Sequence, residues 1–286
     1  MGERPIFKID NHYVRDFNKE DAEVLGHEIL DKFCSEPMKN ELIKTPEEIK
    51  LIDSFNEYLA QDFRRLGLEE YHPFPAEKVH LLTAADFKEN LSRISLDSDY
   101  GLYSPHVHAA VLNKEKATSR LDLFQSIAHE MTHGASFRLY EKSPDENRVY
   151  ENYKTGYRSN KFSGLNEAVT DLVVYQFFLN NQKKLTEDLN ITPEEWDGFE
   201  AVSYREYCNL VNKIMEVIAQ KNNEGVSAVW KRFRLGLFSG TMMHLREVEN
   251  SLEPGALRQL ANLGYKDGVD QEILDYLNQV ISEKKK

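Results

Sequence analysis

Cysteine is nearly absent from this sequence, where Cys34 and Cys208 are the only two among 286 residues. Two thiols are too few for a disulfide scaffold or for a zinc site made of cysteines alone. Long apolar runs are also missing, because the most apolar run, residues 172–179, is far too short to span a bilayer. The N-terminal residues 1–10 are polar and charged and do not resemble a signal peptide. We therefore expect a cytoplasmic protein with no membrane partner.

Basic residues are in deficit, with 36 Lys and Arg against 48 Asp and Glu and a formal net charge of −12. A protein that binds nucleic acid through its phosphates needs a basic surface, so we expect no nucleic-acid partner. The hydrophobic fraction of 41% is sufficient for a folded core. Composition thus indicates a class of protein and a compartment, but no activity.

Helix start signals recur along the chain. Thr45-Pro46-Glu47-Glu48 supplies a capping residue, a proline and two acids where a helix begins, and Gly67 marks its end. The run 192–195 repeats this signal before a long helical pattern that continues towards residue 221. Pro254 also fits the first turn of a helix. Further helices are expected near residues 19–34, 227–237, 254–263 and 270–283.

Strand signals are few and lie together. Residues 79–83 and 106–113 favour buried strands, and the tyrosine-rich segment 138–164 favours a hairpin with a turn at 155–156. The order of elements predicts an α+β fold that is mostly helical with a small mixed sheet. A boundary near 183–191 predicts three parts: an N-terminal helical segment (1–66), a core (67–182) and a helical C-terminal subdomain (183–286).

The segment His129-Glu130-Met131-Thr132-His133 lies in a helical pattern that begins near residue 119. Histidines four residues apart leave one face of a helix, so both rings can bind one zinc ion. Glu130 is turned around the helix axis and can reach a metal-bound water as a general base. The alternative is a pair of surface histidines, but the apolar neighbours of His129 indicate a buried helix.

A second segment, Asn166-Glu167-Ala168-Val169-Thr170-Asp171, lies in a helical pattern that is apolar nearly all round. Buried carboxylates need a cation or hydrogen-bond donors. Glu167 can complete a His-His-Glu ligand set and leave a fourth position for water. Asp171 can accept the second ring N–H of His129 and fix its tautomer. Taken alone, Glu167 and Asp171 would be read as an exposed acidic pair.

These two motifs together resemble the gluzincins, the zinc metallopeptidases typified by thermolysin, over about a third of the chain. The resemblance implies a zincin-like catalytic core with an active-site helix and a glutamate helix. It also implies that helix 46–66 is the backing helix and that residues 106–113 are the edge strand that binds an extended peptide.

The sequence departs from the gluzincin pattern in places. The spacer between His133 and Glu167 is longer than in thermolysin, and no exopeptidase motif precedes the first helix, which disfavours the aminopeptidase branch. A metzincin would have a third histidine six residues after His133, where this chain has Leu139. An endopeptidase is therefore favoured.

The resemblance implies one Zn²⁺ per chain and a peptide or protein substrate. His129, His133 and Glu167 would be the metal ligands and Glu130 the general base. A further donor must stabilise the oxyanion, for which His244 is the candidate and Tyr150, Tyr153 and Tyr157 compete with it. Two other functions stay open: a zinc-binding protein that cleaves nothing, and a zinc hydrolase of non-peptide amides.

Overall fold

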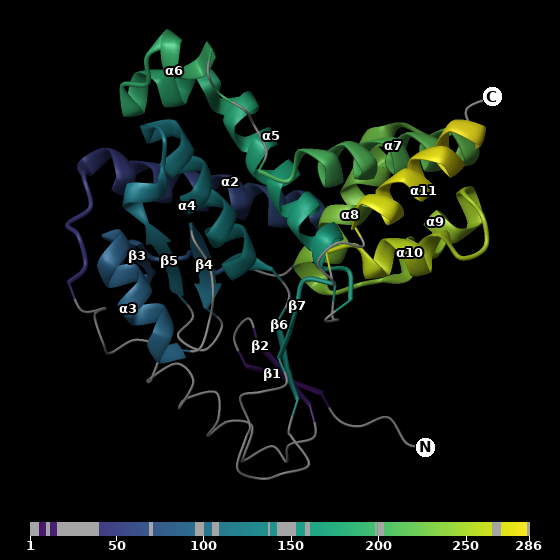
Figure 1. Cartoon of the computed structure of the whole chain (residues 1–286), viewed down its shortest axis with the longest axis horizontal. Coiled ribbons are helices and arrows are strands. Elements are labelled where there is room, and N and C mark those ends of the chain that lie inside the picture. Colours follow the sequence, from purple (N-terminus) through teal and green to yellow (C-terminus); the bar gives the residue numbers. More distant parts are fainter. Residues whose placement is uncertain are drawn as a thin grey trace. The chain divides into compact units, whose positions relative to one another are not determined.

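The architecture comes from a computed structural model. It describes residues 6–9, 12–15, 40–68, 71–94, 100–104, 109–136, 138–141, 153–157, 161–197, 199, 203–264 and 270–284. Over these residues the protein is a mostly helical α+β fold with ten α-helices and two small sheets (Figure 1). The expected fold class is confirmed at this level. The helix expected near residues 19–34 lies outside the described residues.

A three-stranded mixed sheet has the order β3-β5-β4. Its central strand β5 (Ala109–Asn113) is parallel to β3 (Val79–Leu82) and antiparallel to β4 (Gly101–Ser104). Every residue of β5 is buried, as expected for a strand covered on both faces. The prediction that residues 106–113 form the edge strand is therefore wrong for 109–113, because β5 lies between the two outer strands β3 and β4. Residues 106–108 lie outside the described part of the chain.

A four-stranded sheet has the order β1-β2-β6-β7. Strands β1 (Ile6–Ile9) and β2 (His12–Arg15) are antiparallel neighbours. The other two strands, β6 (Arg138–Glu141) and β7 (Tyr153–Thr155), come from the segment expected to form a hairpin. The hairpin turn expected at 155–156 is wrong, because Thr155 ends β7 and Gly156 follows it, with φ of +52°. The residues between β6 and β7 lie outside the described part of the chain.

Helix α2 (Pro46–Leu66) follows its sequence signals closely. Thr45 accepts a hydrogen bond from the Glu48 N–H, and the Glu48 side chain accepts one from the Thr45 N–H. This reciprocal pair satisfies two backbone donors that the first turn leaves open. At the other end Gly67 has φ of +72°, so the helix ends in a left-handed cap as predicted.

Helices α3 (Ala84–Ile94) and α4 (Arg120–Ala135) cover the three-stranded sheet, and two short 3-10 turns, η1 (Ala76–Lys78) and η2 (Lys114–Lys116), join its elements. Helix α3 contacts β3 and β5, where Phe87 packs against Leu82 and Val111. Helix α4 contacts β4 and β5, and α2 packs against α4. The sheet and α2 therefore fix the position of α4.

Helix α5 (Ser163–Leu189) is continuous through most of the boundary expected near 183–191. Its Phe177 ring lies 4.9 Å from that of Phe55 on α2, and its Phe178 ring lies 6.3 Å from that of Trp196 on α6 (Pro193–Asp197). Aromatic contacts of this kind anchor the second half of α5.

The remaining described chain contains only helices: α7 (Arg205–Asn222), α8 (Val226–Ser239), η3 (Met243–Leu245), α9 (Arg246–Ser251), α10 (Ala256–Asn262) and α11 (Asp270–Lys284). The expected helices near 227–237 and 270–283 are confirmed by α8 and α11. The single helix expected from 193 towards 221 is wrong, because α6 and α7 are separate. The chain carries Gly198, a poor helix former, directly after α6. Pro254 precedes α10 in a turn rather than standing in its first turn.

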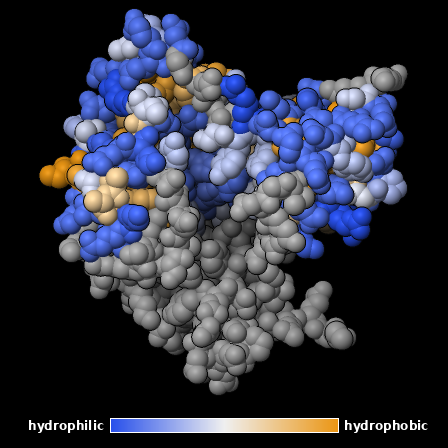
Figure 2. Space-filling model, viewed as in Figure 1, coloured by the Kyte–Doolittle hydropathy of each residue, from blue (hydrophilic) through white to orange (hydrophobic). Residues whose placement is uncertain are grey.

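The chain divides into two compact units, each packed mainly within itself, and α5 contributes to both. Unit 1 takes in the described residues of Met1–Ala135, Leu139–Tyr153 and Gln176–Ala201, and unit 2 those of Ser136–Arg138, Lys154–Tyr175 and Val202–Lys286. The three domain segments expected from the sequence stay a prediction. On the face drawn in Figure 2, hydrophilic residues dominate the coloured surface. None of the described helices has the length and apolar character needed to cross a membrane.

Candidate metal centre

Helix α4 is buried along much of its length. Ile127, Ala128 and Met131 have no exposed surface, which agrees with the burial expected from the sequence. The Thr132 hydroxyl donates to the Ala128 carbonyl at 2.8 Å, so this polar side chain is satisfied inside the helix. His129 and His133 are half-buried on the same helix. They are therefore not a pair of fully exposed surface histidines.

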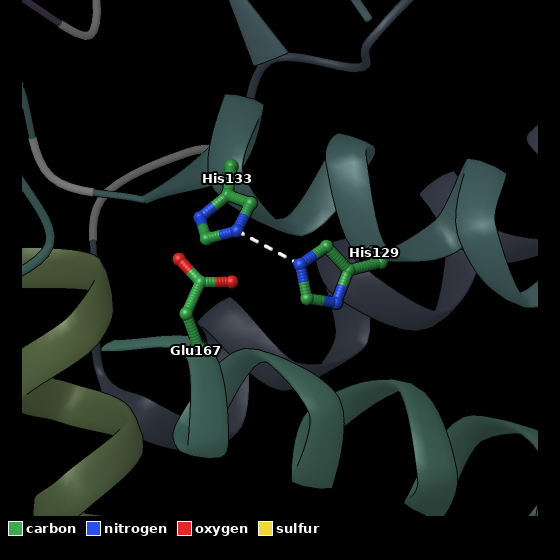
Figure 3. A group of neighbouring side chains, drawn as sticks. All are labelled: His129, His133 and Glu167. Carbon is green, nitrogen blue, oxygen red and sulfur yellow. Dashed lines mark hydrogen bonds between the residues drawn. The ribbon is translucent and has the colours of Figure 1, made fainter. Parts of the chain in front are cut away.

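The two imidazoles face each other as the four-residue spacing predicts. Their Nε2 atoms lie 3.0 Å apart and their ring centroids 4.7 Å apart. Figure 3 shows both rings turned towards Glu167, which comes from α5. Ligand atoms of His129, His133 and Glu167 all lie within 4.8 Å of one another. The structure therefore brings together the three residues that the two motifs supply.

These three residues fit a zinc ion in donor chemistry, and the two histidine nitrogens also fit it in spacing. Two nitrogens that each lie 2.0–2.1 Å from a tetrahedral zinc are separated by roughly 3.3 Å. The measured 3.0 Å between the Nε2 atoms is close to this value. Two imidazoles and one carboxylate leave a fourth tetrahedral position for another ligand. The arrangement is therefore a candidate metal-binding group in which a water molecule or a substrate atom could take the fourth position.

Glu167 stands in the first two turns of α5, on an unbroken helix. The second half of this helix packs through Phe177 against Phe55 of α2. A helix holds its residues at fixed rise and rotation, so the direction in which Glu167 leaves α5 is set by the same regular backbone. The carboxylate is therefore presented by an ordered element rather than by a loop.

Glu130 is buried, with 8% of its surface exposed. It lies directly after His129 on α4, so its side chain leaves the helix in a different direction from the two histidines. A general base must lie within hydrogen-bond reach of the proton that it takes. Its role stays a prediction.

Asp171 lies one turn after Glu167 on α5 and is almost completely buried. Its Oδ2 accepts the backbone N–H of Tyr204 at 2.8 Å. That bond ties the residue before α7 to the glutamate helix. The expected hydrogen bond from His129 to Asp171 stays a prediction.

Asn56 on α2 forms a buried clamp that the sequence analysis missed. Its amide donates to the Phe74 carbonyl and accepts the Phe74 N–H, each at 2.8 Å, and it accepts the Tyr71 hydroxyl at 2.6 Å. The clamped Phe74 ring lies against Gly134, where a Cβ would stand 2.7 Å from Phe74 Cε2. Gly134 directly follows His133, so the clamp supports the last turn of α4. The one sequence signal was a glycine inside a helical pattern.

His244, the predicted oxyanion donor, is buried in unit 2 against aromatic rings. Its centroid lies 5.0 Å from that of Phe233 and 5.9 Å from that of Tyr157. Burial, with the nearby charge of Arg232, lowers the pKa of His244 to about 4, so the ring is neutral at pH 7. Its Nε2 has no hydrogen-bond partner among the described residues. Its role as a donor stays a prediction.

The structure describes the three competing tyrosines to different extents. The Tyr157 hydroxyl donates to the Phe233 carbonyl at 2.8 Å and is completely buried, and burial raises its pKa well above 10. That proton is therefore already committed to a backbone acceptor. Tyr150 lies outside the described residues, and of Tyr153 only the backbone in β7 is described.

Comparison with known proteins adds no family to this geometry. No protein-family model matches the chain, and no curated protein and no solved structure is significantly similar to it.

Proposed function

We propose that this protein is a zinc-dependent metallopeptidase of gluzincin type that acts as an endopeptidase. The observation that carries the proposal is the convergence of His129, His133 and Glu167 within 4.8 Å. Their motifs are the gluzincin pair, and their donor atoms are those that zinc takes in catalytic sites. A purely structural zinc site has no need of a carboxylate such as Glu130 beside the metal.

Each residue of the two motifs has a separate proposed role. His129, His133 and Glu167 would hold the ion, and Asp171 would orient His129 through its second ring nitrogen. Bound zinc would lower the pKa of a water ligand towards about 7 and polarise the carbonyl of the substrate. Glu130 would take the proton from the attacking water and deliver it to the departing amine. The proton thus moves from nucleophile to leaving group through one side chain.

The edge strand β4 favours an extended peptide as the substrate. Among the described residues β4 pairs on one side only, with β5, and it packs against α4, which carries both histidines. A peptide that adds to such an edge gains backbone hydrogen bonds whatever its side chains are. An edge strand beside α4 thus supports peptide cleavage over hydrolysis of a compact non-peptide amide.

The test combines metal analysis with digestion of a peptide mixture. Purified protein is analysed for zinc and then incubated with the mixture, and mass spectrometry detects new termini. Glu130→Gln should keep the zinc and lose about 10²–10⁴-fold in cleavage rate, because it removes the general base. Glu194→Gln, at an exposed position on α6, is the matched control and should leave both zinc content and rate unchanged.

The outcomes separate the candidate functions. Zinc without cleavage of any peptide in the wild type rejects the peptidase and leaves the non-catalytic zinc-binding protein and the hydrolase of non-peptide amides. Cleavage that Glu130→Gln leaves intact rejects the proposed base. Protein prepared without chelators that takes up no zinc rejects the site itself.

A further inference from the structure

Two stacked tyrosines stand at the start of α7. The rings of Tyr204 and Tyr207 lie 5.8 Å apart between centroids and are inclined by only 15°. Tyr204 keeps 39% of its surface exposed, whereas Tyr207 is half-buried. An exposed aromatic ring supported from behind by another ring is a preformed stacking surface, because little side-chain freedom is left to lose on binding.

The inner ring of this pair is anchored. The Tyr207 hydroxyl donates to Asp270 at the start of α11, and the same carboxylate accepts the Gly264 N–H at 2.8 Å. Burial and the neighbouring carboxylate of Asp270 raise the pKa of Tyr207. Its hydroxyl therefore keeps its proton and its bond to Asp270 at neutral pH. Tyr207 therefore acts as a fixed support for the Tyr204 ring.

The pair stands beside the glutamate of the candidate metal centre. The Tyr204 N–H donates to Asp171, and Asp171 lies one turn from Glu167 on the same face of α5. The four residues from Glu167 to Asp171 rise roughly 6 Å along the helix axis. Glu167 is also close enough for its charge to act on Tyr207. The backbone of Tyr204 is therefore tied to the same part of α5 that presents Glu167.

Among the residues that the structure describes, several acidic groups lie near the pair. Glu206 and Asp270 act electrostatically on Tyr207 together with Glu167, and Asp171 contacts the Tyr204 backbone. Arg205 is the one basic residue in this turn of α7. An aromatic face surrounded by carboxylates attracts a cation, since the ring quadrupole and the nearby negative charges act in the same direction.

We infer that Tyr204 is a specificity-determining residue that receives a basic side chain, arginine or lysine, next to the scissile bond of the substrate. This inference rests on the proposed function, because it takes the metal centre as the place where the scissile bond is held. The planar guanidinium of arginine fits the stacking geometry best.

The test measures binding of three hydroxamates to zinc-loaded protein by calorimetry, after zinc uptake has been established. N-acetyl-arginine hydroxamate carries the proposed side chain, N-acetyl-norleucine hydroxamate is its uncharged aliphatic counterpart, and N-acetyl-phenylalanine hydroxamate offers an aromatic ring. The wild type should bind the arginine compound roughly two- to fivefold more tightly than the norleucine compound. Tyr204→Phe should keep this preference and Tyr204→Leu should abolish it. Both variants retain the backbone N–H that bonds to Asp171.

Equal binding of the arginine and norleucine compounds by the wild type overturns the inference, as does a preference that survives in Tyr204→Leu. Tightest binding of the phenylalanine compound also overturns it, because the ring would then select aromatic side chains. Failure to take up zinc or to bind any hydroxamate overturns the proposed function as well. If the protein takes up zinc but binds the hydroxamates equally, the proposed metal centre is retained and the specificity role of Tyr204 is rejected.

Discussion

The Nε2 atoms of His129 and His133 lie 3.0 Å apart on one face of α4. Two neutral imidazoles at this distance can share one hydrogen bond if one of them donates, whereas a metal ion lets both present lone pairs. Glu167 completes the group from α5. Metal binding should therefore depend on each of these three side chains and on the residues that support them.

Removing a metal ligand should weaken zinc binding strongly. His129→Ala or Glu167→Ala removes one of three protein ligands. Zinc affinity should fall by about a hundredfold or more, which exceeds the usual effect of replacing a residue that only hydrogen-bonds to a ligand. Competition with a fluorescent chelator measures this affinity. His72→Ala is the control, because His72 is exposed and should not alter it. Unchanged zinc affinity in both ligand variants would show that the ion binds elsewhere.

Replacing Asp171 tests the predicted orientation of His129. Asp171→Asn keeps an oxygen that can accept the Tyr204 N–H, but it removes the negative charge. If Asp171 orients His129, zinc affinity should fall about 10- to 100-fold while the fold persists. Asp188→Asn, which removes a solvent-accessible ion pair with Lys50, should leave zinc affinity unchanged. An Asp171→Asn protein with wild-type affinity contradicts the orienting role.

Gly134→Ala should disturb the clamp behind His133. Alanine ordinarily favours a helix over glycine by about 1 kcal/mol, but here its Cβ would lie 2.7 Å and 2.9 Å from two Phe74 ring atoms. Asn56 holds the Phe74 backbone through two hydrogen bonds and the Phe74 side chain is buried, so the ring has little room to move. We expect a loss of about 1–3 kcal/mol in unfolding free energy, measured by urea denaturation.

Phe74→Leu in the Gly134→Ala background removes the crowded ring atoms. Part of the lost unfolding free energy and of any lost zinc affinity should then return. A Gly134→Ala protein that is as stable as the wild type would show that Phe74 can shift at little cost.

The buried His244 should make stability depend on pH. Its folded pKa of about 4 lies below the ordinary value of 6.5, so the unfolded state binds more protons between these values. The unfolding free energy therefore falls as the pH decreases from about 6.5 to 4, by up to about 3 kcal/mol. Urea unfolding of the wild type and of His244→Gln across this window checks it, since the variant should lose this part of the slope. An identical slope in both proteins would assign the pH dependence to other groups.

The local features of the fold could be predicted from the sequence because short-range geometry determines them. The cap at Thr45, the left-handed end at Gly67 and the single face shared by His129 and His133 follow from helix geometry over a few residues. The separation of α6 from α7 was missed. A start signal and apolar spacing do not show where a helix is interrupted, although Gly198 offered a hint.

The sequence by itself determined the chemistry that is available: two histidines on one helical face, an adjacent carboxylate, and a second motif with Glu167 and Asp171. Only the tertiary structure decided that Glu167 meets the histidines, that β5 is the central strand and that Phe74 braces Gly134. Residues far apart in the chain meet where buried surfaces fit together. That fit depends on the packing of whole elements, whereas the spacing of residues within one segment reports only the geometry of that segment.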